Sequence, residues 1–112
     1  MNCRIKVSPT FLKGVKRLAK RYPSIKNDIC RLAENLAEDP LQGTDLGGGI
    51  RKIRVRIQSK RKGKSGGGRI IYHCLIVSNS EPEIVLLTIY DKSEKETVTD
   101  AELKEILRRN GL

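Results

Sequence analysis

The chain has 112 residues, 38% of them hydrophobic, and a formal net charge of +10 from 23 basic and 13 acidic residues. This length suits one domain, residues 1–112, with enough apolar side chains for a packed core. Because the sequence has no apolar run of about 20 residues and no signal-peptide pattern at its start, we exclude membrane-spanning and secreted classes and expect a cytoplasmic protein.

A short strand and two helices are predicted in the first part of the chain. Apolar and basic residues alternate over residues 3–7, which predicts a strand with one buried face. Ser8 followed by Pro9 is typical of a helix start, and apolar residues recur at helical spacing over residues 11–22. A Pro-Ser pair then separates this helix from a second one, over residues 25–38.

Three strands and a third helix are predicted in the remainder. Residues 42–49 contain four glycines and are expected to form a loop, and residues 59–68 are expected to form a flexible basic loop. The three strands are predicted over residues 52–58, 69–77 and 83–90, with the last two joined as a hairpin. Thr99 to Glu102 matches a capping box that begins the final helix. The order β-αα-βββ-α predicts an α+β domain, with a mainly antiparallel sheet and the helices packed on one face.

Residue types that hold metals or nucleotides are sparse. The three cysteines are far apart and His73 is the only histidine, so we expect reduced thiols and no structural zinc. The Gly63-Lys64-Ser65 segment lacks the earlier glycine of a phosphate-binding P-loop and leads into a predicted strand. We therefore expect no metal and no cofactor.

Positive charge is concentrated in the middle of the chain. Residues 51–69 contain nine basic residues and no acidic one, so this stretch would attract polyanions; a solvated face that only confers solubility is the alternative. Strand alternation places Lys52, Arg54 and Arg56 on one face, while Arg69 opens the next strand. Together with the segment Tyr90-Asp91-Lys92, these residues predict a concave surface for a phosphodiester backbone.

Two sequence segments resemble a known family. The run GIRKIRVRIQSKRKGKSGGGRIIYH at residues 49–73 and the run LLTIYDK at residues 86–92 resemble toxins of the RelE/ParE superfamily, in particular its HigB-like branch. The resemblance covers most of the chain. It implies a small RelE-like domain and a type II toxin encoded with an antitoxin. It further implies a ribosome-dependent mRNA endoribonuclease, or mRNA interferase. Such an enzyme cleaves mRNA without a metal ion and so inhibits translation.

The resemblance also implies roles for individual residues. The substrate's own 2′-OH would attack the adjacent phosphate, with Arg69 stabilising the phosphorane. Arg54 or Lys52 would orient the phosphate or help to remove the 2′-OH proton, and Lys92 or Tyr90 would assist the leaving oxygen. The implied catalytic residues are Arg54, Arg69, Tyr90 and Lys92. The implied contacts with RNA and the ribosome are Lys52, Arg56, Lys60, Arg61, Lys62 and Lys64.

The expected partners are the ribosome, mRNA and a cognate antitoxin, with no membrane. The antitoxin would be a helix-turn-helix or partly disordered protein that lays an acidic or amphipathic segment over the basic surface. Relatives differ in activity, so three alternatives stay open. They are a ParE-type DNA gyrase inhibitor, a non-catalytic nucleic-acid-binding module and an inactive relative that only binds the antitoxin.

Overall fold

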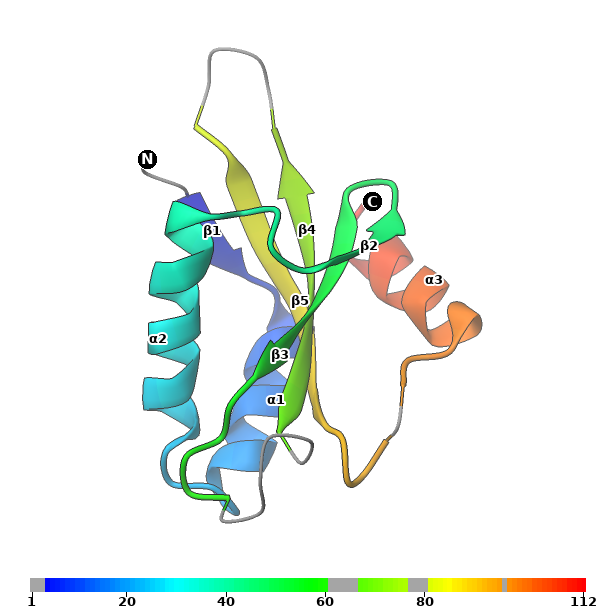
Figure 1. Ribbon diagram of the computed structural model, residues 1–112. Helices are drawn as coiled ribbons and strands as arrows, with labels where there is room; N and C mark the ends of the chain where they lie inside the picture. Colours follow the sequence, from blue (N-terminus) through cyan, green and yellow to red (C-terminus); the bar gives the residue numbers. More distant parts are fainter. Residues whose placement is uncertain (1–3, 61–66, 77–80, 96) are drawn as a thin grey trace.

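The computed structural model describes residues 4–60, 67–76, 81–95 and 97–112. It confirms an α+β domain with a mainly antiparallel sheet (Figure 1). The elements are β1 (Arg4–Val7), α1 (Pro9–Ala19), α2 (Ile25–Glu38), β2 (Thr44–Gly47), β3 (Ile50–Val55), β4 (Gly68–Leu75), β5 (Glu83–Asp91) and α3 (Asp100–Arg109). The five strands are ordered β1-β5-β4-β3-β2, and only the β1–β5 pair is parallel. Parts of three predicted segments, at residue 3, residues 61–66 and residue 77, lie outside the described residues.

Two helices begin at the residues that the sequence indicates. Ser8 Oγ accepts a hydrogen bond of 3.1 Å from the Phe11 N–H, with Pro9 at the first helical position. The same hydroxyl donates to the Leu87 carbonyl over 2.8 Å, which ties the start of α1 to β5. Thr99 and Glu102 form the predicted capping box, so the start of α3 is fixed by reciprocal side-chain contacts.

The main core lies between α1, α2 and one face of the sheet. Phe11, Leu18 and Ile25 of the helical hairpin pack against inward-facing residues of the strands, among them Ile70 and Ile89. These side chains are almost completely buried, and burial of each such side chain contributes about 1.5–3 kcal/mol. This face therefore accounts for the apolar stripes that predicted the two helices.

The third helix does not share this face, so the prediction that all helices pack on one face is wrong. Leu103 and Ile106 of α3 pack against Ile71 and Leu87 in a second, smaller core. Ile70 and Ile71 are adjacent on β4 and both are buried, so consecutive side chains enter different cores on opposite faces of the sheet. Figure 1 shows α3 across the sheet from α1 and α2.

A strand that the sequence did not predict lies within the expected loop at residues 42–49. Strand β2 pairs with β3 in antiparallel register, with Thr44 opposite Lys52 and Asp45 opposite Arg51. All four residues of β2 are exposed, so they carry no alternation of buried and exposed side chains. Three glycines with positive φ (Gly47, Gly48 and Gly49) make the turn into β3.

Close packing of α1 on β5 gives a first testable prediction, the substitution Gly14→Ala. A Cβ at this position would lie 2.7 Å from Cγ2 of Ile89 and 3.1 Å from its carbonyl oxygen. We expect the variant to lose about 1–3 kcal/mol of unfolding free energy in urea denaturation, because overpacking shifts the helix from the strand. Alanine is intrinsically the better helix former by about 1 kcal/mol, so a more stable variant would contradict this packing.

Candidate functional site

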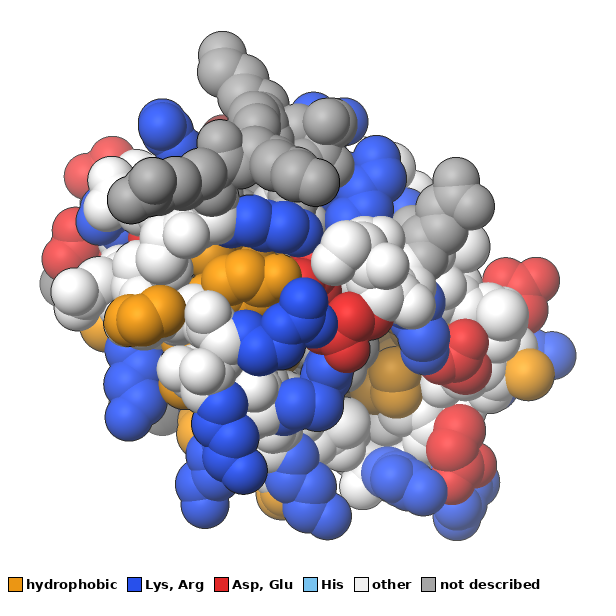
Figure 2. Space-filling model, turned by 90° about the horizontal axis from the view of Figure 1, so that it is seen from below, with side chains coloured by type: hydrophobic (Ala, Val, Ile, Leu, Met, Phe, Trp, Pro, Cys, Tyr) orange, Lys and Arg blue, Asp and Glu red, His pale blue; other side chains and the backbone are white. Residues whose placement is uncertain are grey.

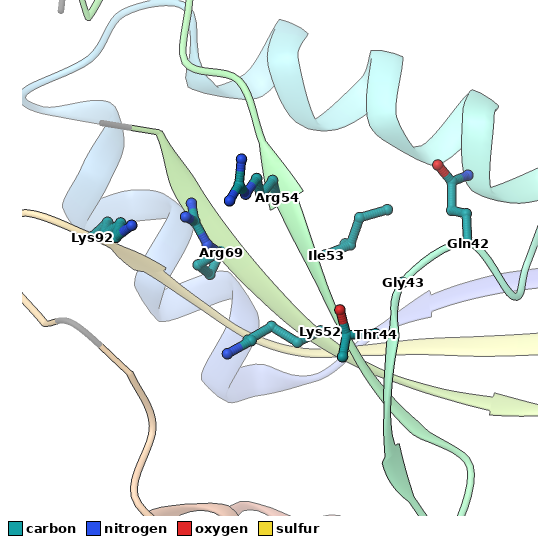
Figure 3. A pocket seen from close by; sticks show the side chains of 8 residues that line it. All are labelled: Gln42, Gly43, Thr44, Lys52, Ile53, Arg54, Arg69 and Lys92. Carbon is teal, nitrogen blue, oxygen red and sulfur yellow. The ribbon is translucent and has the colours of Figure 1, made fainter. Parts of the chain in front are cut away.

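An open cleft of about 510 Å³ lies across the middle of the sheet and brings together four cationic side chains. Lys52 and Arg54 reach it from β3, Arg69 from β4, and Lys92 from the residue after β5. Figure 3 shows Arg54 and Arg69 extending side by side, with Lys92 pointing toward them. Cationic residues that lie up to 40 positions apart in the sequence thus line the same cleft.

Strand register places the two arginines side by side. Arg54 is directly opposite Arg69 in the β3–β4 pair, and Tyr90 is opposite Arg69 in the β4–β5 pair. Arg69 is only 7% exposed, and its guanidinium donates to the Gly68 carbonyl over 3.0 Å. Burial, followed by the neighbouring charge of Arg54, lowers the pKa of Arg69 from its ordinary value.

The cleft contains no acidic partner for these charges. Within the described part of the chain, no carboxylate forms an ion pair with Lys52, Arg54, Arg69 or Lys92. Like charges directly opposite on neighbouring strands destabilise a sheet, and a buried charge without a partner is costly. The arrangement is therefore costly for the protein alone and complementary to an anionic ligand.

The opposite wall of the cleft was not predicted from the sequence. Gln42, Gly43 and Thr44 form it, in the segment that leads into β2. Arg51 holds this segment by donating to the Leu41 carbonyl over 2.8 Å and to the Gly43 carbonyl over 2.6 Å. A pattern of charged and apolar residues contains no signal for such a wall, because its position depends on backbone contacts.

Tyr90 lies below the cleft rather than in it. Its side chain is 5% exposed and packs in the core under α3. Its hydroxyl is buried beside Arg69, Thr97 and Val98, but has no hydrogen bond of good geometry with the described residues. Tyr90, which the resemblance implies as an assistant of the leaving oxygen, is therefore not part of the lining of the cleft.

Lys60 also differs from its predicted role in contacting RNA. Its Nζ lies 2.5 Å from Oδ1 of Asp91, and only 12% of its side chain is exposed. Asp91 is completely buried and also accepts a 2.6 Å hydrogen bond from the Tyr22 hydroxyl. Burial alone would raise the pKa of Asp91, but hydrogen bonds from Lys60, Tyr22 and Ser93 outweigh it and hold the pKa well below its usual value. The charge of Lys60 thus compensates the buried carboxylate of Asp91 and stabilises the folded protein.

Arg56 is the remaining predicted site residue that the structure describes, and it does not line the cleft. Arg56 is exposed and lines a neighbouring groove between α2 and β3, together with Arg31. His73 lies further along β4 and is half-buried. Arg61, Lys62 and Lys64 fall outside the described residues, so their predicted contacts stay predictions. No group of three metal-binding side chains occurs among the residues that the structure describes.

Basic side chains also dominate the surface around the cleft. Figure 2 views the molecule from the end where β3 finishes, β4 begins and β5 finishes, and lysine and arginine side chains gather over much of it. None of the helices in the described ranges, the longest being the 14-residue α2, has the length and apolar character to cross a membrane. Together, the cleft and its surroundings form a strongly basic surface on a small α+β domain, and such a surface attracts polyanions.

Comparison with protein families identifies the class more closely. A family model described as the RelE toxin of the RelE/RelB toxin-antitoxin system matches residues 10–110. The chain therefore belongs to the RelE toxin family, and this membership implies an antitoxin partner. The match includes both cores and all four cations of the cleft. Assignment to the HigB-like branch stays a prediction.

Proposed function

We propose that this protein is a toxin that cleaves mRNA on the ribosome and so inhibits translation. The observation that carries the proposal is the pair Arg54 and Arg69, which lie opposite each other in the cleft without a carboxylate partner among the described residues. Arginine presents donors in a planar fork that matches phosphate oxygens, and an RNA phosphate would compensate both charges.

The cleavage chemistry needs no protein nucleophile. The 2′-hydroxyl oxygen of the RNA attacks the adjacent phosphorus, a new O2′–P bond forms, and the P–O5′ bond breaks. The products are a 2′,3′-cyclic phosphate and a 5′-hydroxyl, so no water is consumed in this step. Negative charge increases on the phosphoryl oxygens in the transition state, where Arg54 and Arg69 would stabilise it.

The two lysines of the cleft have separate roles in this proposal. Lys92 donates a proton to the leaving 5′ oxygen, Lys52 accepts the 2′-hydroxyl proton as the general base, and Arg54 orients the phosphate. Tyr90 acts only through its packing beneath Arg69, because its hydroxyl is buried. Arg56, Arg61, Lys62 and Lys64 would contact ribosomal RNA.

The proposed partners follow from the same surface. The antitoxin would cover the cleft with an acidic or amphipathic segment, because such a segment supplies the carboxylates that the four cations lack among the described residues. A cytoplasmic location, where mRNA and ribosomes are present, is part of the same proposal.

The proposal is tested by mapping RNA ends after incubation of purified protein with mRNA, with and without programmed ribosomes. We expect cleavage only with ribosomes, with 5′-hydroxyl and 2′,3′-cyclic phosphate ends. A single 2′-deoxy substitution at the cleaved nucleotide should abolish the product while leaving neighbouring sequences intact.

Other outcomes would identify the alternative functions. Inhibition of DNA supercoiling by purified gyrase, with intact mRNA, would replace the proposal with a gyrase inhibitor. RNA that is bound but never cut, with affinity that falls steeply with salt, would indicate a non-catalytic binding module. Antitoxin binding without either effect would indicate an inactive relative.

A further inference from the structure

A second cavity, of about 250 Å³, lies next to the cleft and shares one residue with it. Lys52 of β3 lines both spaces, so the cavity opens beside the place where the phosphate would be held. Its other walls come from Leu46 of β2 and from the segment that begins α3. The cavity thus lies on the α3 face of the sheet, the face that also carries Lys52, Arg54 and Arg69.

The lining of this cavity differs in chemistry from that of the cleft. Leu46, Val98 and Leu103 provide apolar surface, while Thr97 and Asp100 provide a hydroxyl and a carboxylate. Asp100 occupies the first position of α3, directly after the Thr99 cap. The capping box fixes the backbone of this turn, so Asp100 has a defined position in the lining of the cavity.

We propose that this cavity binds one base of the RNA whose phosphate occupies the cleft, and that Asp100 selects bases with an amino group. The inference rests on the proposed function, because it assumes an RNA strand at Lys52. A cavity of about 150 Å³ holds a benzene ring, so about 250 Å³ is enough for a single base between Leu46 and the α3 segment.

Hydrogen-bond chemistry determines the selectivity. An ionised carboxylate only accepts hydrogen bonds, and the amino groups of adenine, cytosine and guanine donate them. Uracil has no amino group, and its single base-pairing donor, N3–H, lies between two carbonyl oxygens that an Asp100 carboxylate would repel. Thr97 can donate or accept, so it adapts to the neighbouring edge of each base.

A buried polar group also lies beside the cavity. The Tyr90 hydroxyl lies next to Thr97 and Val98, two residues of the cavity lining, and forms no hydrogen bond of good geometry with the described residues. Unsatisfied buried hydroxyls are rare in folded proteins because each one costs free energy. Tyr90 is also opposite Arg69 on the neighbouring strand, so the two residues lie side by side on the sheet.

The test compares wild-type protein with Asp100→Asn, Thr97→Val and the control Glu105→Gln. The control removes one negative charge from the same helix at a position that pairs with Arg108 and Arg109, not at the cavity. Each protein is titrated against four short fluorescent RNAs, which differ in one base next to a non-cleavable 2′-deoxy nucleotide. Cleavage is measured in parallel on ribosomes programmed with the four matching codons.

We expect wild type and Glu105→Gln to bind and cleave the uracil RNA roughly tenfold less well than the other three, which is the value of one hydrogen bond. Asparagine both donates and accepts, so Asp100→Asn should bring uracil to within about threefold of the others. Thr97→Val should weaken all four by a similar factor.

Four results would overturn the inference. They are equal affinity of the wild type for the four RNAs, no affinity for any, unchanged selectivity in Asp100→Asn, and an effect of Asp100→Asn on antitoxin binding alone. The last result would assign the cavity to an antitoxin side chain. The binding and cleavage measurements also separate the two proposals. Selective binding without cleavage would contradict only the proposed nuclease function. Cleavage without selectivity among the four bases would contradict only the proposed base site.

Discussion

Replacing Arg69 by glutamine is expected to lower the rate of mRNA cleavage on ribosomes by about 10²–10³-fold, without loss of stability. Removing one preorganised donor to a developing oxyanion has an effect of this size. Arg69 is buried opposite Arg54, and no carboxylate of the described residues pairs with it. Its removal relieves a like-charge contact, so the free energy of unfolding should be equal or higher.

The measurement combines single-turnover cleavage on programmed ribosomes with urea unfolding of the same protein preparations. Lys20→Gln is the matched control, because it removes one positive charge from an exposed position in the C-terminal cap of α1. Arg69→Lys should retain part of the rate, because lysine keeps the charge and loses the planar fork. An Arg69→Gln variant that cleaves at the wild-type rate would remove Arg69 from the mechanism.

The second large effect is expected for Asp91→Asn, which should lose about 3–5 kcal/mol of unfolding free energy at pH 7. Asp91 is completely buried and binds the Lys60 ammonium and the Tyr22 hydroxyl. Breaking one side of a buried ion pair leaves the other charge without compensation, which has an effect of this size. Urea unfolding measures it, with Glu34→Gln on the exposed face of α2 as control.

The pH dependence of this effect has a defined sign. Hydrogen bonds hold the pKa of Asp91 below its usual value in the folded protein, so the carboxylate contributes stability above its unfolded pKa of about 4. That contribution is lost as the pH falls through the lower folded pKa. The stability difference between wild type and Asp91→Asn should therefore be constant near neutrality and decrease below about pH 4.

A double variant distinguishes this pair from a general loss of packing. Combining Asp91→Asn with Lys60→Met removes both charges, and part of the lost stability should return. If the double variant is as unstable as the sum of the two single variants, the ion pair is not the source of the effect.

The sequence predicted the cleft better than the architecture around it. Alternation along β3 places Lys52 and Arg54 on one face, and strand pairing then requires Arg69 and Lys92 to lie beside them. These positions follow from the period of two residues in a strand. The family resemblance assigned the same residues to a site, and their catalytic roles remain a proposal.

The features that were not predicted depend on contacts that leave no periodic pattern. Strand β2 is fully exposed, so only its backbone pairing with β3 identifies it. The sequence of α3 does not show which face of the sheet the helix covers. Its apolar side chains, such as Leu103 and Ile106, could pack on either face, because both faces of this sheet are buried. Lys60 belongs to a run of basic residues in the sequence, and only the fold shows its contact with Asp91.

The pairing of β1 with β5 has a consequence for the order in which the protein is made. Ile5 lies beside Ile84, so strand β1 can pair only after β5, a strand much later in the sequence, has been synthesised. Contacts of such long sequence separation form late in folding. A nascent chain whose β5 is still inside the ribosome lacks the strand that joins β1 to β4, and it lacks Lys92 beside Arg69. The cationic cleft is therefore completed only after residue 92 has left the ribosome that makes the chain.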